Sequence, residues 1–215
     1  MVECLYCRDF KPARRMADGN IWEVIYTVSQ SNGNECVITV EQDPSIRSWS
    51  VIFGDVWFCS GQSNMNWPMS DIYNATEEVA NSASYTNIRM FQIYEQQSDE
   101  EEDDLVGGLG GQWDGWYTPD NASRLKQFSA VCFLYARSMT DRLSPSGESK
   151  RVFGLIDSNW GGTRVEAWMS QDALDACNVP PNNDGSKNSN SVLWNAMVHP
   201  FLRHNIYGGL WYQGI

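Results

Sequence analysis

Apolar residues gather in four segments of strand length along most of the chain, at 55–59, 88–93, 151–156 and 208–212. Between these segments, apolar residues recur at helical spacing, most clearly in "FSAVCFLYARSMTDRL" at 128–143 and also at 75–83, 166–176 and 192–203. Strands that alternate with helices are typical of a parallel sheet with crossover helices. The pattern therefore predicts an α/β fold.

The N-terminal part of the chain has a different pattern. Residues 20–53 hold two short β-type stretches, "IWEVIYTVSQ" and "ECVITVEQ", which are separated by the turn signal "SNGN" and followed by Asp43-Pro44. These stretches predict a pair of short strands. We interpret residues 1–50 as part of a β region that precedes the main domain at 51–215.

Composition limits the classes of function. The chain has 215 residues, of which 42% are hydrophobic, which is enough for a packed core. The net charge of −12 argues against nucleic acid as a partner, because binding to phosphates depends on Lys and Arg. No stretch approaches the roughly 20 apolar residues of a membrane helix, so no membrane span is expected.

Part of the acidic excess lies in one run, "DEEEDD" at 99–104. Blocks of like charge are usually solvated loops, and we expect one here. A calcium site is the alternative, but the run lacks the glycine-spaced oxygen ligands of a calcium loop.

Signals for the compartment of the protein disagree. The N-terminal "MVECLYCRDFKPARRMADG" has no continuous apolar core of a signal peptide, so the chain is cytosolic if this start is the true one. Asn74-Ala-Thr76 and Asn121-Ala-Ser123 are acceptable N-glycosylation sites, and six cysteines would suit an oxidising compartment.

The cysteines leave several roles open. Cys4 and Cys7 form a C-x-x-C, which could be redox-active or half of a zinc site, but no second C-x-x-C follows and no thioredoxin-like strand precedes it. Cys59 lies just before a turn. It is expected either to pack as a small residue or to form a disulfide.

Polar and glycine-rich clusters follow three of the predicted strands. Ser63 comes after the first strand, Gly161 and Gly162 come after the third, and Gln213 comes after the fourth. Parallel strands end at one edge of their sheet, where α/β proteins bind their ligands. We therefore expect these residues to lie together.

This combination suits nucleophilic chemistry on a carbonyl group. A serine hydroxyl needs a base to accept its proton, and the resulting oxyanion needs fixed donors nearby. Backbone N–H groups near Ser63 and at Gly162, together with the Gln213 amide, could supply them. The alternative is that the glycine pair only turns a strand into a helix.

Four blocks of the sequence carry a family resemblance. "GDVWFCSGQSNMNWPMS", "FSAVCFLYARSM", "GLIDSNWGGTRVEAWMS" and "LWNAMVHPFL...IYGGLWYQG" resemble, in order and approximate spacing, the sialate O-acetylesterases of the SGNH hydrolase superfamily. The resemblance spans residues 20–214. It implies a flavodoxin-like three-layer α/β sandwich and an esterase that removes O-acetyl groups from sialic acids.

The resemblance also implies roles for single residues. Ser63 is the nucleophile, and Gly162 and Gln213 help to form the oxyanion hole. The supporting residues are Gly61, Gln62, Asn64 and Gly161. The substrate is an O-acetylated sialic acid or a related acetylated sugar, no metal or organic cofactor is expected, and the family is commonly lysosomal or secreted.

The sequence departs from the family pattern near its end. The family motif usually continues with glutamate where Ile215 stands, and the Asp and His of its triad lie further on, so the last strand and this triad segment are expected to be missing here. His199 and His204 are interpreted as structural. Two alternatives to a sialate esterase stay open: a truncated or spliced, catalytically silent chain, and an acetyl esterase for other sugars.

Overall fold

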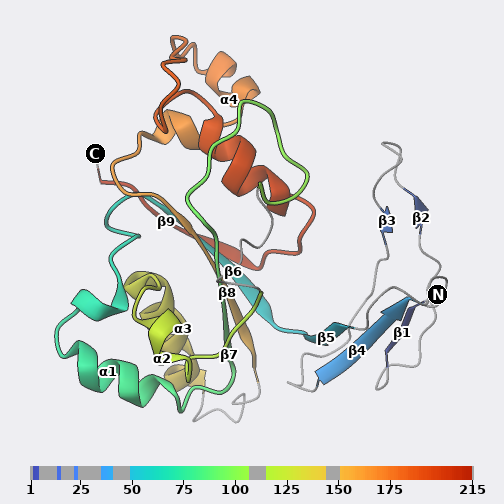
Figure 1. The fold of residues 1–215 in the computed structure, drawn as a ribbon, viewed down its shortest axis with the longest axis vertical. Coiled ribbons are helices and arrows are strands. Elements are labelled where there is room, and N and C mark those ends of the chain that lie inside the picture. The colour runs from blue at the N-terminus through green and yellow to red at the C-terminus, as the bar shows by residue number, and fades with distance from the viewer. Residues whose placement is uncertain are drawn as a thin grey trace.

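A four-stranded parallel sheet forms the centre of the computed structural model, which describes residues 2–4, 14–15, 22–23, 35–40, 49–106, 115–143 and 151–214. The strands lie in the order β7-β8-β6-β9 (Figure 1). Their bounds are β6 Asp55–Gly61, β7 Ile88–Gln92, β8 Phe153–Asn159 and β9 Gly208–Tyr212. All three pairings are parallel, as the alternating pattern predicts.

The two central strands extend further than their apolar residues indicate. β6 continues through Ser60 and Gly61, and β8 continues through the polar sequence of Asp157, Ser158 and Asn159, all of them buried. The polar side chains at the end of β8 have partners: the Ser158 hydroxyl donates to the Met197 carbonyl at 2.9 Å, and Asn159 Nδ2 donates to the Asp157 carboxyl group. The buried Ser60 hydroxyl of β6, by contrast, has no hydrogen-bond partner among the described residues. The sheet itself thus carries polar side chains to the edge where the parallel strands end.

Helices cover both faces of the sheet (Figure 1). One face packs against α1 Ala75–Ser82, α2 Ala122–Leu125 and α3 Ala130–Leu143, and the other against η3 Val165–Trp168, α4 Gln171–Ala176, η4 Trp194–Val198 and η5 His199–Phe201. A short helical turn, η1 Met69–Asp71, follows β6. Side chains of β8 alternate between the two cores, with Leu155 in one and Ile156 in the other.

Two of the expected helices are interrupted. The segment at 166–176 is divided because Met169 and Ser170 have extended backbone angles between η3 and α4. The segment at 192–203 forms a short π-helical stretch, η4, followed by the single turn η5, which contains Pro200. Helical spacing of apolar residues was therefore a correct guide to burial, but not to continuous helix.

The N-terminal strands form two small antiparallel sheets. One has the order β1-β4-β5, and the other pairs β2 with β3; the bounds are β1 Val2–Cys4, β2 Arg14–Arg15, β3 Trp22–Glu23, β4 Glu35–Val40 and β5 Trp49–Ile52. β4, in the second expected stretch, pairs with β1 and β5, and β3, in the first stretch, pairs with β2. Residues 24–34 lie outside the described residues, so a pairing of the two stretches across "SNGN" stays a prediction. The boundary at residue 50 also stays a prediction.

A disulfide joins the sheet to its helical layer. Cys59 in β6 and Cys132 in α3 are bonded, and both are fully buried. This resolves the two roles left open for Cys59. Cys7 lies outside the described residues, so the proposed Cys4–Cys7 site is untested, whereas Cys177 is exposed and free.

Helices of membrane-spanning length and hydropathy do not occur in the described parts of the chain.

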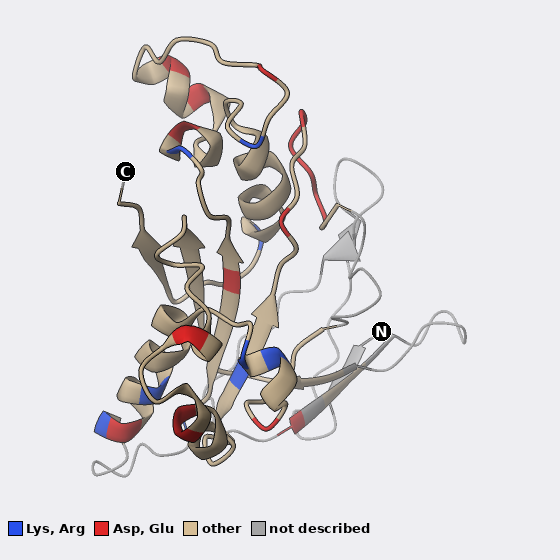
Figure 2. Ribbon diagram, turned by 60° about the vertical axis from the view of Figure 1, so that its left-hand side comes forward, with Lys and Arg blue, Asp and Glu red and all other residues tan. Residues whose placement is uncertain are grey.

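Figure 2 shows acidic residues on helices at both ends of the molecule, so the excess negative charge is not confined to the run at 99–104.

Candidate active site

The ends of β6, β8 and β9 lie side by side at one edge of the sheet. Gly61 is in register with Asn159 of β8 and with Tyr212 of β9. Ser63, the Gly161-Gly162 pair and Gln213 follow these three positions directly along the chain. The three sequence clusters therefore meet in one place.

Ser63 lies exposed on a tight turn after β6. The turn is closed by the N–H groups of Met65 and Asn66, which both donate to the Gln62 carbonyl, at 2.9 and 3.0 Å. Gln62 is buried, and its side-chain Oε1 accepts the Ser63 hydroxyl at 2.6 Å and the Ser63 backbone N–H at 2.8 Å. Gln62 thus holds Ser63 in place, because the hydroxyl and the backbone N–H of Ser63 both donate to the same amide oxygen.

Gly61 allows β6 to enter this turn. It has a φ of +139°, and a Cβ at this position would lie 2.2 Å from the Tyr212 carbonyl oxygen of β9. A side chain would therefore meet both a left-handed backbone and a rigid neighbouring strand.

Gly61→Ala is expected to destabilise the fold by about 3 kcal/mol, since strained backbone positions typically cost 1–3 kcal/mol each and the clash is with backbone. Gly209→Ala is the matched control, because its Cβ would lie 3.8 Å from the nearest atom, the Phe58 carbonyl oxygen. Urea unfolding of the two variants measures the difference. Equal losses of stability would show that the close approach at Gly61 is not limiting.

The Gly161-Gly162 turn packs directly against the serine. A Cβ at Gly161 would lie 3.6 Å from both Cα and Cβ of Ser63, so this backbone approaches the serine closely. Gly162 is exposed and has a φ of +70°. The carbonyls of the turn are held by side chains of one segment: Lys187 Nζ donates to Gly161 at 2.6 Å, and Asn188 Nδ2 donates to Gly162 at 3.3 Å.

Gln213 connects β9 to the same turn. Its Nε2 donates to the Thr163 carbonyl at 2.9 Å, and its Oε1 is buried without a hydrogen-bond partner among the described residues. An amide nitrogen carries two N–H groups, so one donor can serve Thr163 and the other a ligand. Asn64 lies at the same edge, with its Nδ2 3.1 Å from the position of a Gly214 Cβ.

A polar cavity of about 430 Å³ adjoins this edge. Asn66 links it to the serine turn, since its Nδ2 lies 3.7 Å from the position of a Gly161 Cβ. The lining is mostly polar and comes from the ends of β7 and β8 and the turns beside them: Asn66, Gln92, Ile93, Tyr94, Glu95, Gln127, Asp157 and Asn159. Amide and carboxyl groups of this density suit a ligand rich in hydroxyl groups.

The sequence interpretation missed this cavity. Its signals were the polar run "QIYEQ" at the end of β7 and the polar residues of "DSN" in β8, neither of which was singled out as part of a site. Neither run indicates by itself that the two strand ends face one cavity.

Asp157 is a fully buried carboxyl group in the wall of the cavity. It accepts the Ser129 N–H at 3.1 Å and Gln92 Nε2 at 3.4 Å, and it also contacts Asn159 Nδ2. Burial raises the pKa of Asp157 to about 7, although the hydrogen bond from Ser129 acts in the opposite direction. The group therefore changes its protonation state near neutral pH.

This carboxyl group should make stability depend on pH. Below about pH 4 it is protonated in both the folded and the unfolded chain, and as the pH rises toward 7 the unfolded chain releases its proton first, so stability falls. Between about pH 5 and pH 8, wild type should lose on the order of 1–3 kcal/mol relative to Asp157→Asn. Urea unfolding at both pH values measures this, and parallel pH profiles would contradict it.

Both ring nitrogens of His199 contact residues of the acidic run at 99–104. Its Nδ1 lies 2.8 Å from the Glu102 carbonyl oxygen, and its Nε2 lies 3.4 Å from a Glu101 carboxyl oxygen. Glu101 also accepts Trp194 Nε1 at 3.1 Å. With both ring nitrogens engaged, His199 has a structural role, and the acidic run is in part anchored to η4 and η5 rather than purely solvated.

The His204 ring packs against Phe201, with 5.3 Å between ring centroids. Within the described residues, no group of three or more His, Cys, Asp or Glu side chains could hold a metal ion.

Comparison with known proteins gives several relatives. Sialate O-acetylesterases of Pongo abelii and Homo sapiens are each 41% identical to this chain in an alignment of 178 residues that covers 79% of this chain and 32% of each relative. The sialate O-acetylesterase of Mus musculus is 35% identical in an alignment of 207 residues that covers 79% of this chain and 36% of the relative. The chain thus spans about a third of the length of these proteins.

A solved structure agrees. A carbohydrate acetylesterase from Xanthomonas citri has a TM-score of 0.65 and 26% identity, covering 84% of this chain and 37% of its own. No protein-family model matches the chain. The resemblance to sialate O-acetylesterases is therefore confirmed, and the α/β fold with its four-stranded parallel sheet matches the structure of this carbohydrate acetylesterase.

Proposed function

We propose that this protein is a serine carboxylic-ester hydrolase that removes O-acetyl groups from sialic acids, with Ser63 as its nucleophile. One observation carries the proposal: the exposed Ser63 lies against the Gly161-Gly162 turn and beside a polar cavity, at the edge where three strands end. The identity of 41% to sialate O-acetylesterases supports the substrate class.

In the proposed reaction, the Ser63 hydroxyl leaves Gln62 Oε1 and attacks the acetyl carbonyl carbon of the substrate. A C–O bond forms to Ser63, and negative charge develops on the carbonyl oxygen. The Gly162 N–H and a Gln213 amide N–H are the proposed donors to this oxyanion, joined by the Ser63 N–H once it also leaves Gln62 Oε1. The sugar alcohol then leaves with a proton, and water hydrolyses the acetyl-serine to acetate.

The proton of Ser63 needs a base. Gln62 Oε1, the acceptor of the Ser63 hydroxyl at 2.6 Å, is an amide oxygen and is not basic enough for this role. We propose that the base is the triad histidine that the family resemblance places after Gly214.

We also propose that the fold is the flavodoxin-like, three-layer sandwich of the SGNH hydrolases.

An oxidising compartment, lysosomal or secreted, fits this function. The proposal is supported by the Cys59–Cys132 disulfide and by the positions of Asn74 and Asn121, both exposed at the N-terminal ends of helices. Both asparagines are the proposed glycosylation sites.

The experiment is acetate release from 9-O-acetyl-N-acetylneuraminic acid compared with an acetylated xylo-oligosaccharide. In this and the other activity experiments the full-length protein is used, which carries the proposed base. We expect kcat/KM to be at least ~10-fold higher for the sialic acid. The reverse order would favour a second candidate, an esterase for neutral acetylated sugars, which the resemblance to the Xanthomonas citri carbohydrate acetylesterase supports.

A further inference from the structure

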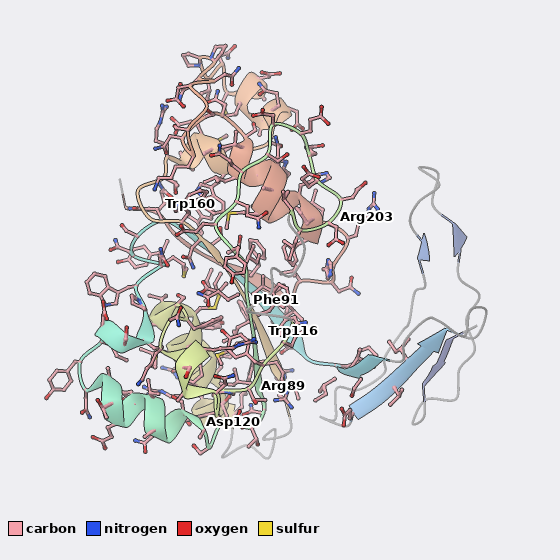
Figure 3. The ribbon with its side chains drawn as sticks, in the orientation of Figure 1. Arg89, Phe91, Trp116, Asp120, Trp160 and Arg203 are labelled. Carbon is pink, nitrogen blue, oxygen red and sulfur yellow. A yellow bond between two sulfur atoms is a disulfide. The ribbon has the colours of Figure 1, made fainter. Side chains whose placement is uncertain are left out.

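A lysine side chain reaches the turn that packs against Ser63. The half-buried Lys187 places its Nζ 2.6 Å from the Gly161 carbonyl oxygen and 3.6 Å from the position of a Gly162 Cβ. The same ammonium lies 5.2 Å from the centre of the Trp160 ring. Figure 3 labels Trp160 at the end of the sheet away from Arg89 and Asp120. A positive charge is therefore fixed at the catalytic edge.

This ammonium retains capacity for a ligand. It carries three N–H donors, and the Gly161 carbonyl accepts one of them. The space beside the exposed Gly162 is open: apart from its neighbours in the chain, Lys187 Nζ is the one atom of the described residues within 4 Å of the position of its Cβ. A ligand group next to Gly162 would therefore be within reach of Lys187.

Glu95 supplies the opposite charge on the cavity side of the serine. Its carboxyl oxygen accepts Asn66 Nδ2 at 3.4 Å, and it lines the polar cavity. Burial raises the pKa of Glu95, and the charge of Lys187 acts against this effect, so the two groups lie within electrostatic range. A ligand that crosses the serine turn would meet a carboxyl group at one end and an ammonium at the other.

The charge of Lys187 matters for an anionic ligand. The chain has a net charge of −12, and Asp and Glu lie on helices at both ends of the molecule (Figure 2). A carboxylate that approaches such a surface is repelled unless a cation is present at the site itself. Charge-assisted hydrogen bonds to an ammonium provide that attraction.

We propose that Lys187 binds the carboxylate of an acidic sugar and so selects acidic over neutral acetylated sugars. This inference rests on the function proposed for Ser63, because the acetyl group must reach the serine while the carboxylate reaches Lys187. Lys187 also holds the Gly161 carbonyl, so a test must separate binding of the carboxylate from support of the turn.

Two ligands that differ only at C1 make that separation: the methyl glycoside of N-acetylneuraminic acid, which is anionic, and its C1 methyl ester, which is neutral. In calorimetric titrations, wild type should bind the acid about tenfold more tightly than the ester, and Lys187→Gln should remove this preference by weakening the acid alone. Glu95→Gln should strengthen binding of the acid, because it removes a nearby negative charge.

Two further variants serve as controls. Asn188→Ala removes the hydrogen bond to the Gly162 carbonyl without changing charge, so it should affect the acid and the ester alike. Arg142→Gln removes a positive charge from the last turn of α3, at the opposite edge of the sheet, and should change neither affinity.

Equal affinity of wild type for acid and ester would overturn the proposal. So would equal weakening of both ligands in Lys187→Gln, which would assign Lys187 to the turn alone. Acetate release from 4-nitrophenyl acetate, a substrate without a carboxylate, tests Ser63 independently. If the protein released no acetate from 4-nitrophenyl acetate but still bound the acid more tightly than the ester, the result would contradict the esterase function and not the carboxylate site.

Discussion

Replacing Ser63 by alanine is expected to lower acetate release at least ~1000-fold, because removal of a nucleophile leaves only binding and oxyanion stabilisation. The hydroxyl of Ser63 lies on an exposed turn against Gly161, and the buried Gln62 Oε1 that loses this donor keeps the Ser63 backbone N–H at 2.8 Å. Stability should therefore stay close to that of wild type. The measurement is kcat/KM on an O-acetylated sialic acid, with thermal unfolding to confirm the fold.

Ser70→Ala is the control for this variant. Ser70 is also exposed after β6, but its hydroxyl donates to the Asp71 carboxylate at 2.7 Å and lies outside the strand-end cluster. Activity should be unchanged. Acetate release by a folded Ser63→Ala protein at more than a tenth of the wild-type rate would exclude Ser63 as the nucleophile.

Removal of the Cys59–Cys132 disulfide should have the largest effect on stability. The bond closes a loop between residues separated by 73 positions and joins β6 to α3. Constraint of the unfolded chain by a loop of this length contributes about 4 kcal/mol. The double variant Cys59→Ala/Cys132→Ala should lose that amount, together with some packing, since both side chains are fully buried.

Cys177→Ala is the matched control for this pair, because Cys177 is exposed and free. Urea unfolding without reductant should give the control a stability close to that of wild type. A double variant within ~1 kcal/mol of wild type would contradict a stabilising role of the disulfide. The disulfide ends four residues before Ser63, so loss of activity should accompany loss of stability.

The strands and their edge could be predicted from the sequence because local patterns determine them. The apolar runs at 88–93 and 208–212 match β7 and β9 closely, and the alternation with helices gives parallel pairing. Since parallel strands end at one edge, the positions of Ser63, Gly162 and Gln213 follow from the order of the elements alone.

Other parts of the site depend on contacts between distant residues. The 73-residue separation of Cys59 and Cys132 has no local signal, because the pairing depends on how α3 packs on β6. Lys187 reaches Gly161 from a segment 26 residues away, and the wall of the cavity combines the ends of β7 and β8. The polar residues at the ends of the central strands β6 and β8 were not predicted as strand, because strands were identified by their apolar residues.

Identification of the acetylated residue during turnover is the most direct test of Ser63 as the nucleophile. The protein is mixed with 9-O-acetyl-N-acetylneuraminic acid, quenched in acid within the first turnovers, digested and analysed by mass spectrometry. We expect an acetyl ester on the peptide that contains Ser63, and none on that peptide in Ser63→Ala. Turnover of the substrate with acetyl found on another residue, or undiminished in Ser63→Ala, would contradict the proposed mechanism.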